Sequence, residues 1–182
     1  MGLGQKYQRV GEYGQFAKIP ERVFKEKFRY PFLVLIEVSN PDPEEDTDDF
    51  FTGTRTGVEL NTLLEIVEGR RLDPAAPVFP VIKREGANPY SGLITIGRAS
   101  NCDIVLHING VSKFHAYLAE SLTEPGQFLV GDGSSKNGTL LNGRRIDRKF
   151  RSPIYNGDSV SLSAVLVLRF FTPGGFWSIL QF

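Results

Sequence analysis

Residues 131–143 read GDGSSKNGTLLNG, a stretch in which glycines and two Asn-Gly pairs surround two serines and a lysine. Glycine adopts backbone conformations that let consecutive N–H groups line one side of a loop, and short hydroxyls add further donors. Such a loop can bind an anion. Asn142-Gly143 also matches the two-residue turn of a β-hairpin, because both central residues of that turn need positive φ.

A nucleotide-binding P-loop is the obvious competing interpretation of this stretch. Gly133 and Gly138 have the glycine spacing of that motif. The motif continues with Lys and then Ser or Thr, whereas here Thr139 follows Gly138 and no helical pattern comes after it. A nucleotide-using enzyme is therefore weakly supported.

The loop is one of several motifs that follow one another along the chain. They are Gly97-Arg98, Ser112-x-x-His115, Ser135-x-Asn137-Gly138-Thr139, Asn142-Gly143 and Gly157-Asp158. This ordered set closely resembles the forkhead-associated (FHA) domain over about residues 75–172. The resemblance implies an eleven-stranded β-sandwich whose loops, clustered at one end, bind phosphothreonine peptides.

A phosphothreonine side chain carries nearly two negative charges and three acceptor oxygens, so its binding site needs converging cationic and hydroxyl donors. Arg98 offers a planar fork of donors that suits phosphate, Ser112 a hydroxyl, and Lys113 a flexible point charge. Asn137 has both a donor and an acceptor, which suits a peptide backbone beside the phosphate. The resemblance implies these contacts for Arg98, Ser112 and Asn137, with contributions from Lys113 and Lys136.

The remaining motif residues are expected to support the loops. They are Gly97, His115, Gly138, Thr139, Asn142, Gly143 and Asp158. Ser112, His115 and Asp132 also allow a hydrolase triad to be drawn. We reject the triad because no nucleophile-elbow motif is present, and because the resemblance implies that His115 is a buried brace.

Composition narrows the classes of function. The 182 residues contain 21 Lys plus Arg and 21 Asp plus Glu, so a net charge of zero favours neither a nucleic-acid nor a membrane partner. One cysteine and two histidines lack metal-ligand spacing, so we expect no disulfide, metal or cofactor. The N-terminus has no charged-then-apolar leader, which predicts a cytoplasmic protein. The apolar run Val160–Phe171 is too short to span a membrane and is interpreted as a buried strand.

The sequence pattern differs between the two parts of the chain. From about Pro77 onward, short apolar stretches alternate with turn residues, which is typical of an all-β sandwich. Earlier, PERVFKEKFRY predicts a short helix, PFLVLIEV a strand and LNTLLEIVEG a helix, whereas PDPEEDTDD at 41–49 is an acidic loop. We therefore expect an all-β fold with a mixed α/β N-terminal extension. Its parts are the extension (1–74), the FHA domain (75–172) and a C-terminal tail (173–182).

These observations predict a non-enzymatic signalling adaptor whose phosphothreonine-containing partner is phosphorylated by an upstream Ser/Thr kinase. The alternative is a structural or assembly protein that uses the same fold for contacts that need no phosphate. Thr47, in EEDTDDFF, has a context suited to an acidophilic kinase. It is a candidate regulatory phosphosite, because a phosphorylated N-terminal segment could fold back into the pocket, as in some FHA proteins.

Overall fold

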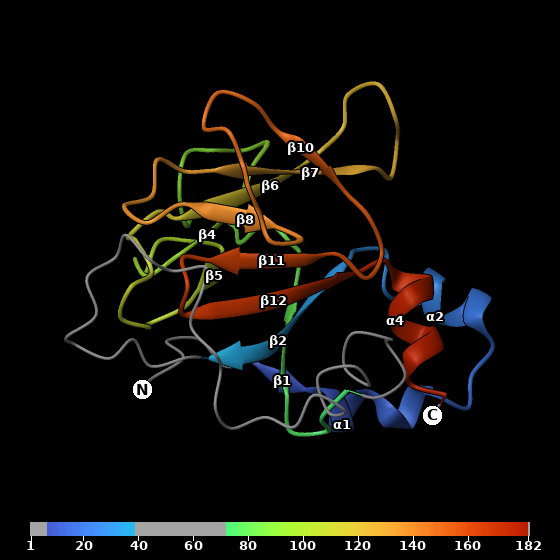
Figure 1. Ribbon diagram of the computed structural model, residues 1–182. Helices are drawn as coiled ribbons and strands as arrows, with labels where there is room; N and C mark the ends of the chain where they lie inside the picture. The colour runs from blue at the N-terminus through green and yellow to red at the C-terminus, as the bar shows by residue number, and fades with distance from the viewer. Residues whose placement is uncertain (1–6, 39–71, 182) are drawn as a thin grey trace.

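The computed structural model describes residues 7–38 and 72–181, and its strands form two packed sheets (Figure 1). The seven-stranded sheet has the order β1-β3-β2-β12-β11-β8-β9, and the five-stranded sheet has the order β10-β7-β6-β4-β5. The first sheet contains β1 (Gln8–Arg9), β2 (Phe32–Val38), β3 (Pro77–Pro80), β8 (Thr139–Leu141), β9 (Arg144–Arg145), β11 (Ser159–Leu162) and β12 (Leu166–Phe171). The second contains β4 (Ile94–Gly97), β5 (Ile104–Val105), β6 (Ala116–Glu120), β7 (Phe128–Asp132) and β10 (Ser152–Ile154).

The all-β sandwich predicted from the sequence is confirmed. A hydrophobic core lies between the sheets, with buried residues from both, such as Ile96 and Leu118 from the smaller sheet and Leu162 and Leu168 from the larger. Twelve strands are present in the described residues, where the resemblance implied eleven. The shortest strands contain only two residues and carry no recognisable sequence pattern.

A strand from the expected N-terminal extension lies in the middle of the larger sheet. β2 pairs antiparallel with β3 on one side and with β12 on the other. A boundary at residue 75 therefore passes through the sandwich. PFLVLIEV shows strand propensity, but propensity does not reveal which strands will be its neighbours.

Helices pack against part of the outer face of the larger sheet, at the end where β2 begins and β12 finishes. They are α1 (Val10–Tyr13), the 3₁₀ turn η1 (Gly14–Phe16), α2 (Glu21–Lys27) and α4 (Pro173–Ile179). A second core between these helices and the sheet contains Tyr13, Phe24, Phe32 and Phe176. The helix expected in PERVFKEKFRY is thus confirmed as α2, and the expected C-terminal tail contains α4. The helix expected near residues 60–69, the acidic loop 41–49 and Thr47 lie outside the described residues.

The apolar run Val160–Phe171 is a hairpin, and its interpretation as one buried strand was wrong. β11 and β12 pair antiparallel through this run, and the chain reverses at Ser163, whose φ is 53°. The Ser163 hydroxyl donates to the carbonyl of Gly110 at 3.2 Å, a distant contact that local sequence cannot show. Among the described residues, no helix is sufficiently long and apolar to cross a membrane.

The two ends of the sandwich differ. In Figure 1 the start of β8, and with it the loop 133–138, lies at the left end, whereas α2 and α4 lie at the right end. The helical end is closed by the aromatic second core. The opposite end is formed by loops that connect strands of both sheets.

Candidate functional site

Two of the loops are joined through the residues that follow β4. The Arg98 N–H donates to the carbonyl of Ser112 at 2.9 Å, and the Ala99 N–H donates to that of Lys113 at 3.0 Å. A Cβ on Gly97 would collide with the Lys113 carbonyl oxygen and lie 2.9 Å from its carbon. Gly97 therefore permits a close backbone approach that brings Arg98 beside Ser112 and Lys113.

The side chain of Ser112 links these loops to the loop 133–138. Its Oγ accepts a hydrogen bond from the backbone N–H of Lys136 at 2.9 Å. Because this bond uses a lone pair of the oxygen, the hydroxyl hydrogen remains available to donate to another group. The exposed Arg98 side chain donates from Nε to the Val111 carbonyl at 3.3 Å, and its two amino groups carry four further donors.

His115 lies beneath the surface of the same loops, is fully buried and links them through hydrogen bonds. Its Nδ1 accepts from the Ser112 N–H at 3.0 Å, so Nε2 carries the proton and donates to the Gly138 carbonyl at 3.0 Å. Burial lowers the pKa of His115, against the opposing effects of the Gly138 hydrogen bond and the Asp132 charge. Both ring nitrogens are engaged by backbone groups, so this histidine is not arranged as the base of a triad.

The loop 133–138 exposes Lys136 and Asn137 and turns back at Gly138, whose φ is 87°. Ser135 is buried beneath it, where its Oγ accepts from the Gly138 N–H at 2.8 Å and donates to Asp132 at 2.7 Å. The structure therefore brings together Arg98, Ser112, Lys113 and the loop that carries Lys136 and Asn137. The common feature is a set of donors at the ends of three mutually bonded loops.

Residues 94–163 match the family model described as the FHA domain. This range runs from β4 to the turn after β11 and contains all three loops. The chain contains a forkhead-associated (FHA) domain. The sandwich extends beyond the matched range on both sides, through β1, β2, β3 and β12.

Three similar proteins illustrate the range of this FHA domain's relatives. Serine/threonine-protein kinase cds1 of Schizosaccharomyces pombe is 29% identical over 107 residues, which cover 56% of this chain and 22% of the kinase. ABC transporter ATP-binding/permease protein Rv1747 of Mycobacterium tuberculosis is 29% identical over 113 residues, 62% of this chain and 11% of the transporter. Both relatives are thus much longer. The crystal structure of the FHA domain of CT664 protein from Chlamydia trachomatis matches with a TM-score of 0.46 and 16% identity, covering 79% of this chain and 97% of that one.

A buried carboxylate organises the FHA loop 133–138. Asp132 accepts from the Ser135 N–H at 3.0 Å, the Ser135 hydroxyl at 2.7 Å and the Thr139 hydroxyl at 2.7 Å. Burial raises the pKa of Asp132, but these hydrogen bonds outweigh it and hold the pKa below its usual value. From the sequence, the only role suggested for Asp132 is in the rejected triad. The spacing of Asp132 and Ser135 could have indicated this contact, since Asp and Ser side chains readily form such local hydrogen bonds.

A second buried carboxylate, which sequence reasoning missed, supports the loop that begins with Arg98. Asp103 accepts from the Thr95 N–H and hydroxyl, each at 2.8 Å, and from Lys83 Nζ at 2.9 Å. Burial alone would raise the pKa of Asp103, but the hydrogen bonds from Thr95, Lys83 and Arg84 lower it to about 2. No short sequence motif connects these residues, because Lys83 lies 20 positions before Asp103.

Asn142 and Asp158 stabilise two neighbouring turns. Asn142 and Gly143 have φ of 51° and 78° and form the two-residue connection between β8 and β9. Asn142 Nδ2 donates to Asp158 at 2.8 Å, and the second carboxylate oxygen accepts from the Tyr155 N–H at 2.7 Å. The β8–β9 hairpin is therefore tied to the turn before β11.

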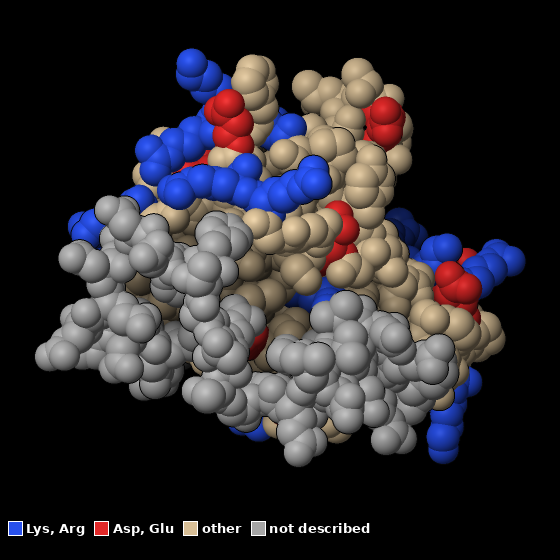
Figure 2. Space-filling model, viewed as in Figure 1, with Lys and Arg blue, Asp and Glu red and all other residues tan. Residues whose placement is uncertain are grey.

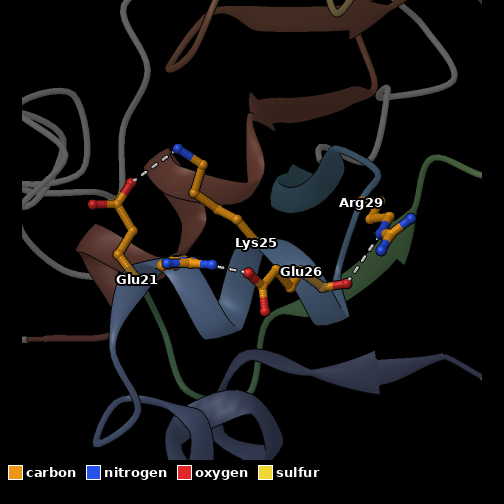
Figure 3. Close-up of a pocket in the computed structure, with 5 residues that line it drawn as sticks. Glu21, Lys25, Glu26 and Arg29 are labelled. Atoms are coloured by element: carbon orange, nitrogen blue, oxygen red, sulfur yellow. Dashed lines mark hydrogen bonds and ion pairs between the residues drawn. The ribbon is translucent and has the colours of Figure 1, made fainter.

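A shallow hollow on α2 contains many charged side chains but no comparable set of free donors (Figure 3). Lys25 pairs with Glu21 at 3.5 Å, and Arg22 pairs with Glu26 at 2.9 Å. Arg29 Nε donates to the backbone carbonyl of Glu26 at 3.2 Å. These charges are satisfied within the helix and its end, so the loop end of the sandwich is the better candidate site.

Replacing His115 tests its bracing contacts. His115→Ala is expected to lower the free energy of unfolding by about 1–3 kcal/mol, because it leaves the Ser112 N–H and the Gly138 carbonyl without their partner. The measurement is denaturant unfolding of both proteins near pH 7.5. An unchanged midpoint would contradict the bracing role.

The difference in the free energy of unfolding between the wild type and His115→Ala should also depend on pH. Because the pKa of folded His115 is lowered, its contribution to stability is present above the unfolded value of about 6.5 and is lost as pH falls below it. The gap in stability between the wild type and His115→Ala should therefore narrow between about pH 7 and pH 5.

Proposed function

We propose that this FHA domain binds phosphothreonine peptides at the three loops. The observation that carries the proposal is the hydrogen bond from the Lys136 N–H to Ser112 Oγ. It fixes the Ser112 hydroxyl with its hydrogen free to donate, and the Arg98 side chain is held at the carbonyl of the preceding residue, Val111. A phosphate group requires this combination of a hydroxyl and a forked cationic donor.

Each of the side chains at the loop ends has a distinct role in this proposal. Arg98 supplies the bidentate contact, Ser112 a hydroxyl donor, and Lys113 and Lys136 long-range attraction. Asn137, exposed at the end of its loop, binds the backbone of the peptide beside the phosphorylated residue. His115 and the buried Ser135 and Asp132 position these groups without touching the ligand.

The proposed role of the protein is that of an adaptor without catalytic activity. Its partner would be phosphorylated by a Ser/Thr kinase. The match to a Ser/Thr kinase that is 29% identical supports a link to phosphorylation signalling. The alternative is a structural protein that binds partners through the faces of the sandwich without phosphate. A set of donors converging at loop ends favours phosphate binding, because contacts through the sheet faces do not require it.

Binding to an oriented phosphothreonine peptide library tests the proposal. The best peptide is expected to bind with micromolar affinity, about −8 kcal/mol, and its unphosphorylated form at least about a hundredfold more weakly. Isothermal titration calorimetry measures both. Equal affinity for the two forms would favour the structural alternative.

A further inference from the structure

The segment 144–151, RRIDRKFR, forms a cationic strip that the proposed phosphate contacts do not use. It contains five Lys or Arg residues and one Asp. The five cationic residues are all exposed, whereas Ile146 points into the main core. Figure 2 shows a band of Lys and Arg side chains across this face, over the region where Figure 1 draws β8. We define the cationic strip as Arg144, Arg145, Arg148, Lys149 and Arg151.

The cationic strip begins directly beside the phosphate loops. Arg145 is paired with Leu140 across the β8–β9 hairpin, and its guanidinium lies against the backbone of Gly138, the residue after Asn137. Arg148 Nη2 donates to the Ser135 carbonyl, and its Nε lies 3.5 Å from Asp132. Two members of the strip therefore contact the loop that carries Lys136 and Asn137.

Most charges of the strip are left unneutralised by the protein. Within residues 7–38 and 72–181, Arg144, Arg145 and Lys149 form no ion pair, and Arg151 lies over the ring of Tyr117 at 5.4 Å. On α2, by contrast, the basic side chains of Arg22 and Lys25 each pair with a glutamate. Unpaired like charges at neighbouring positions repel one another. An anionic partner would relieve this repulsion, so its binding would be favourable.

We propose that the cationic strip binds carboxylate side chains that flank the phosphothreonine in the partner, so the domain prefers acid-flanked phosphothreonine. This inference rests on the proposed function. A run of Asp and Glu fits better than a second phosphate, because the cations are spread along eight residues and do not converge on one point. The contacts lie at an exposed rim, where charges contribute mainly to specificity and to association rate.

The test compares matched peptides on the full chain. One phosphothreonine peptide carries four Asp or Glu residues around the phosphothreonine, and its control carries Asn and Gln at the same positions. At low salt the acidic peptide should bind about tenfold more tightly, the sum of several weak exposed contacts. The ratio should fall steadily toward one as the salt is raised to about 0.5 M, since screening weakens exposed charge pairs.

Variants of the strip locate the effect. Arg144→Gln/Arg145→Gln/Lys149→Gln should reduce the ratio to about twofold or less. Arg144→Gln/Lys149→Gln retains the Arg145 contact with Gly138 and should still reduce the ratio clearly. The matched control Arg22→Gln/Lys25→Gln removes two charges from α2 and should keep the ratio near tenfold. Thermal unfolding checks that each variant is folded.

The other outcomes overturn the inference in distinguishable ways. Equal affinity of the wild type for the acidic and neutral phosphopeptides would remove the inference and leave phosphothreonine binding intact. Failure of both phosphopeptides to bind would remove the proposed function and the inference together. A gain in affinity only when a second phosphorylated residue replaces the carboxylates would assign the strip to phosphate and overturn the carboxylate assignment.

Discussion

Arg98→Ala should reduce the affinity for a phosphothreonine peptide by about ten- to a hundredfold, which corresponds to about 1.5–3 kcal/mol. The arginine is anchored by its backbone hydrogen bond to the Ser112 carbonyl and by its Nε hydrogen bond to the Val111 carbonyl, so its side chain is held beside the segment that carries Ser112. The substitution removes charge-assisted hydrogen bonds to the phosphate. Calorimetry with phosphorylated and unphosphorylated peptides measures the loss.

Two further substitutions sharpen this result. Arg98→Lys should recover little of the affinity, because an ammonium keeps the charge but loses the planar fork. Arg22→Ala on α2 is the matched control, since the Arg22 side chain is 88% exposed and, within the described part of the chain, pairs with Glu26 on the same helix. It should bind the peptide as the wild type does.

The stability of the Arg98→Ala protein separates binding from folding. Arg98 is exposed, so the thermal midpoint of the Arg98→Ala protein should stay close to that of the wild type. A folded Arg98→Ala protein that binds its phosphorylated partner at full strength would show that another surface holds the partner. The structural alternative would then be preferred.

A fragment that begins at residue 75 should not fold, although it contains the whole range that matches the FHA family model. It lacks β2, which bridges β3 and β12 in the larger sheet. Phe32, Leu33 and Val34 are fully buried, and each contributes about 1.5–3 kcal/mol by burial. Their sum, about 5–9 kcal/mol, approaches the total stability of a typical domain. Circular dichroism and thermal melting of the fragment and the full chain measure the difference.

Substitutions within β2 provide the control for this deletion. Leu33→Ala should lower the free energy of unfolding by about 2–5 kcal/mol, because Leu33 packs between the two sheets. Val38→Ala, at a position that is 37% exposed in the same strand, should cost much less. A cooperative melt of the fragment from residue 75, near the midpoint of the full chain, would show that β2 is dispensable.

Short stretches of sequence were sufficient to predict the features that depend on local conformation. Asn142-Gly143 predicted the tight β8–β9 turn, because positive φ at two successive residues is a local requirement that Asn and Gly meet at low cost. The ordered motifs around Arg98, Ser112 and Asn137 predicted the family, because loops that bind one ligand keep characteristic residues at characteristic spacings. The all-β class followed from the alternation of apolar stretches and turn residues.

Contacts between distant segments were decided only by the tertiary structure. The apolar character of residues 32–38 predicted a strand, but its place between β3 and β12 depends on which hydrogen-bonding edges are free in the folded sheet. The run 160–171 predicts one strand because Ser163 by itself is no turn signal. In the structure the φ of Ser163 is 53°, and its hydroxyl donates to the distant Gly110 carbonyl. The contacts of Arg145 with Gly138 and of Arg148 with Ser135 likewise join residues separated by turns. The sequence alone thus determined the fold class and the residues of the proposed phosphate site, since these depend on local conformation and motif spacing. The tertiary structure decided which strands complete the sandwich and which charges lie beside the site, because both depend on packing between segments far apart in the chain.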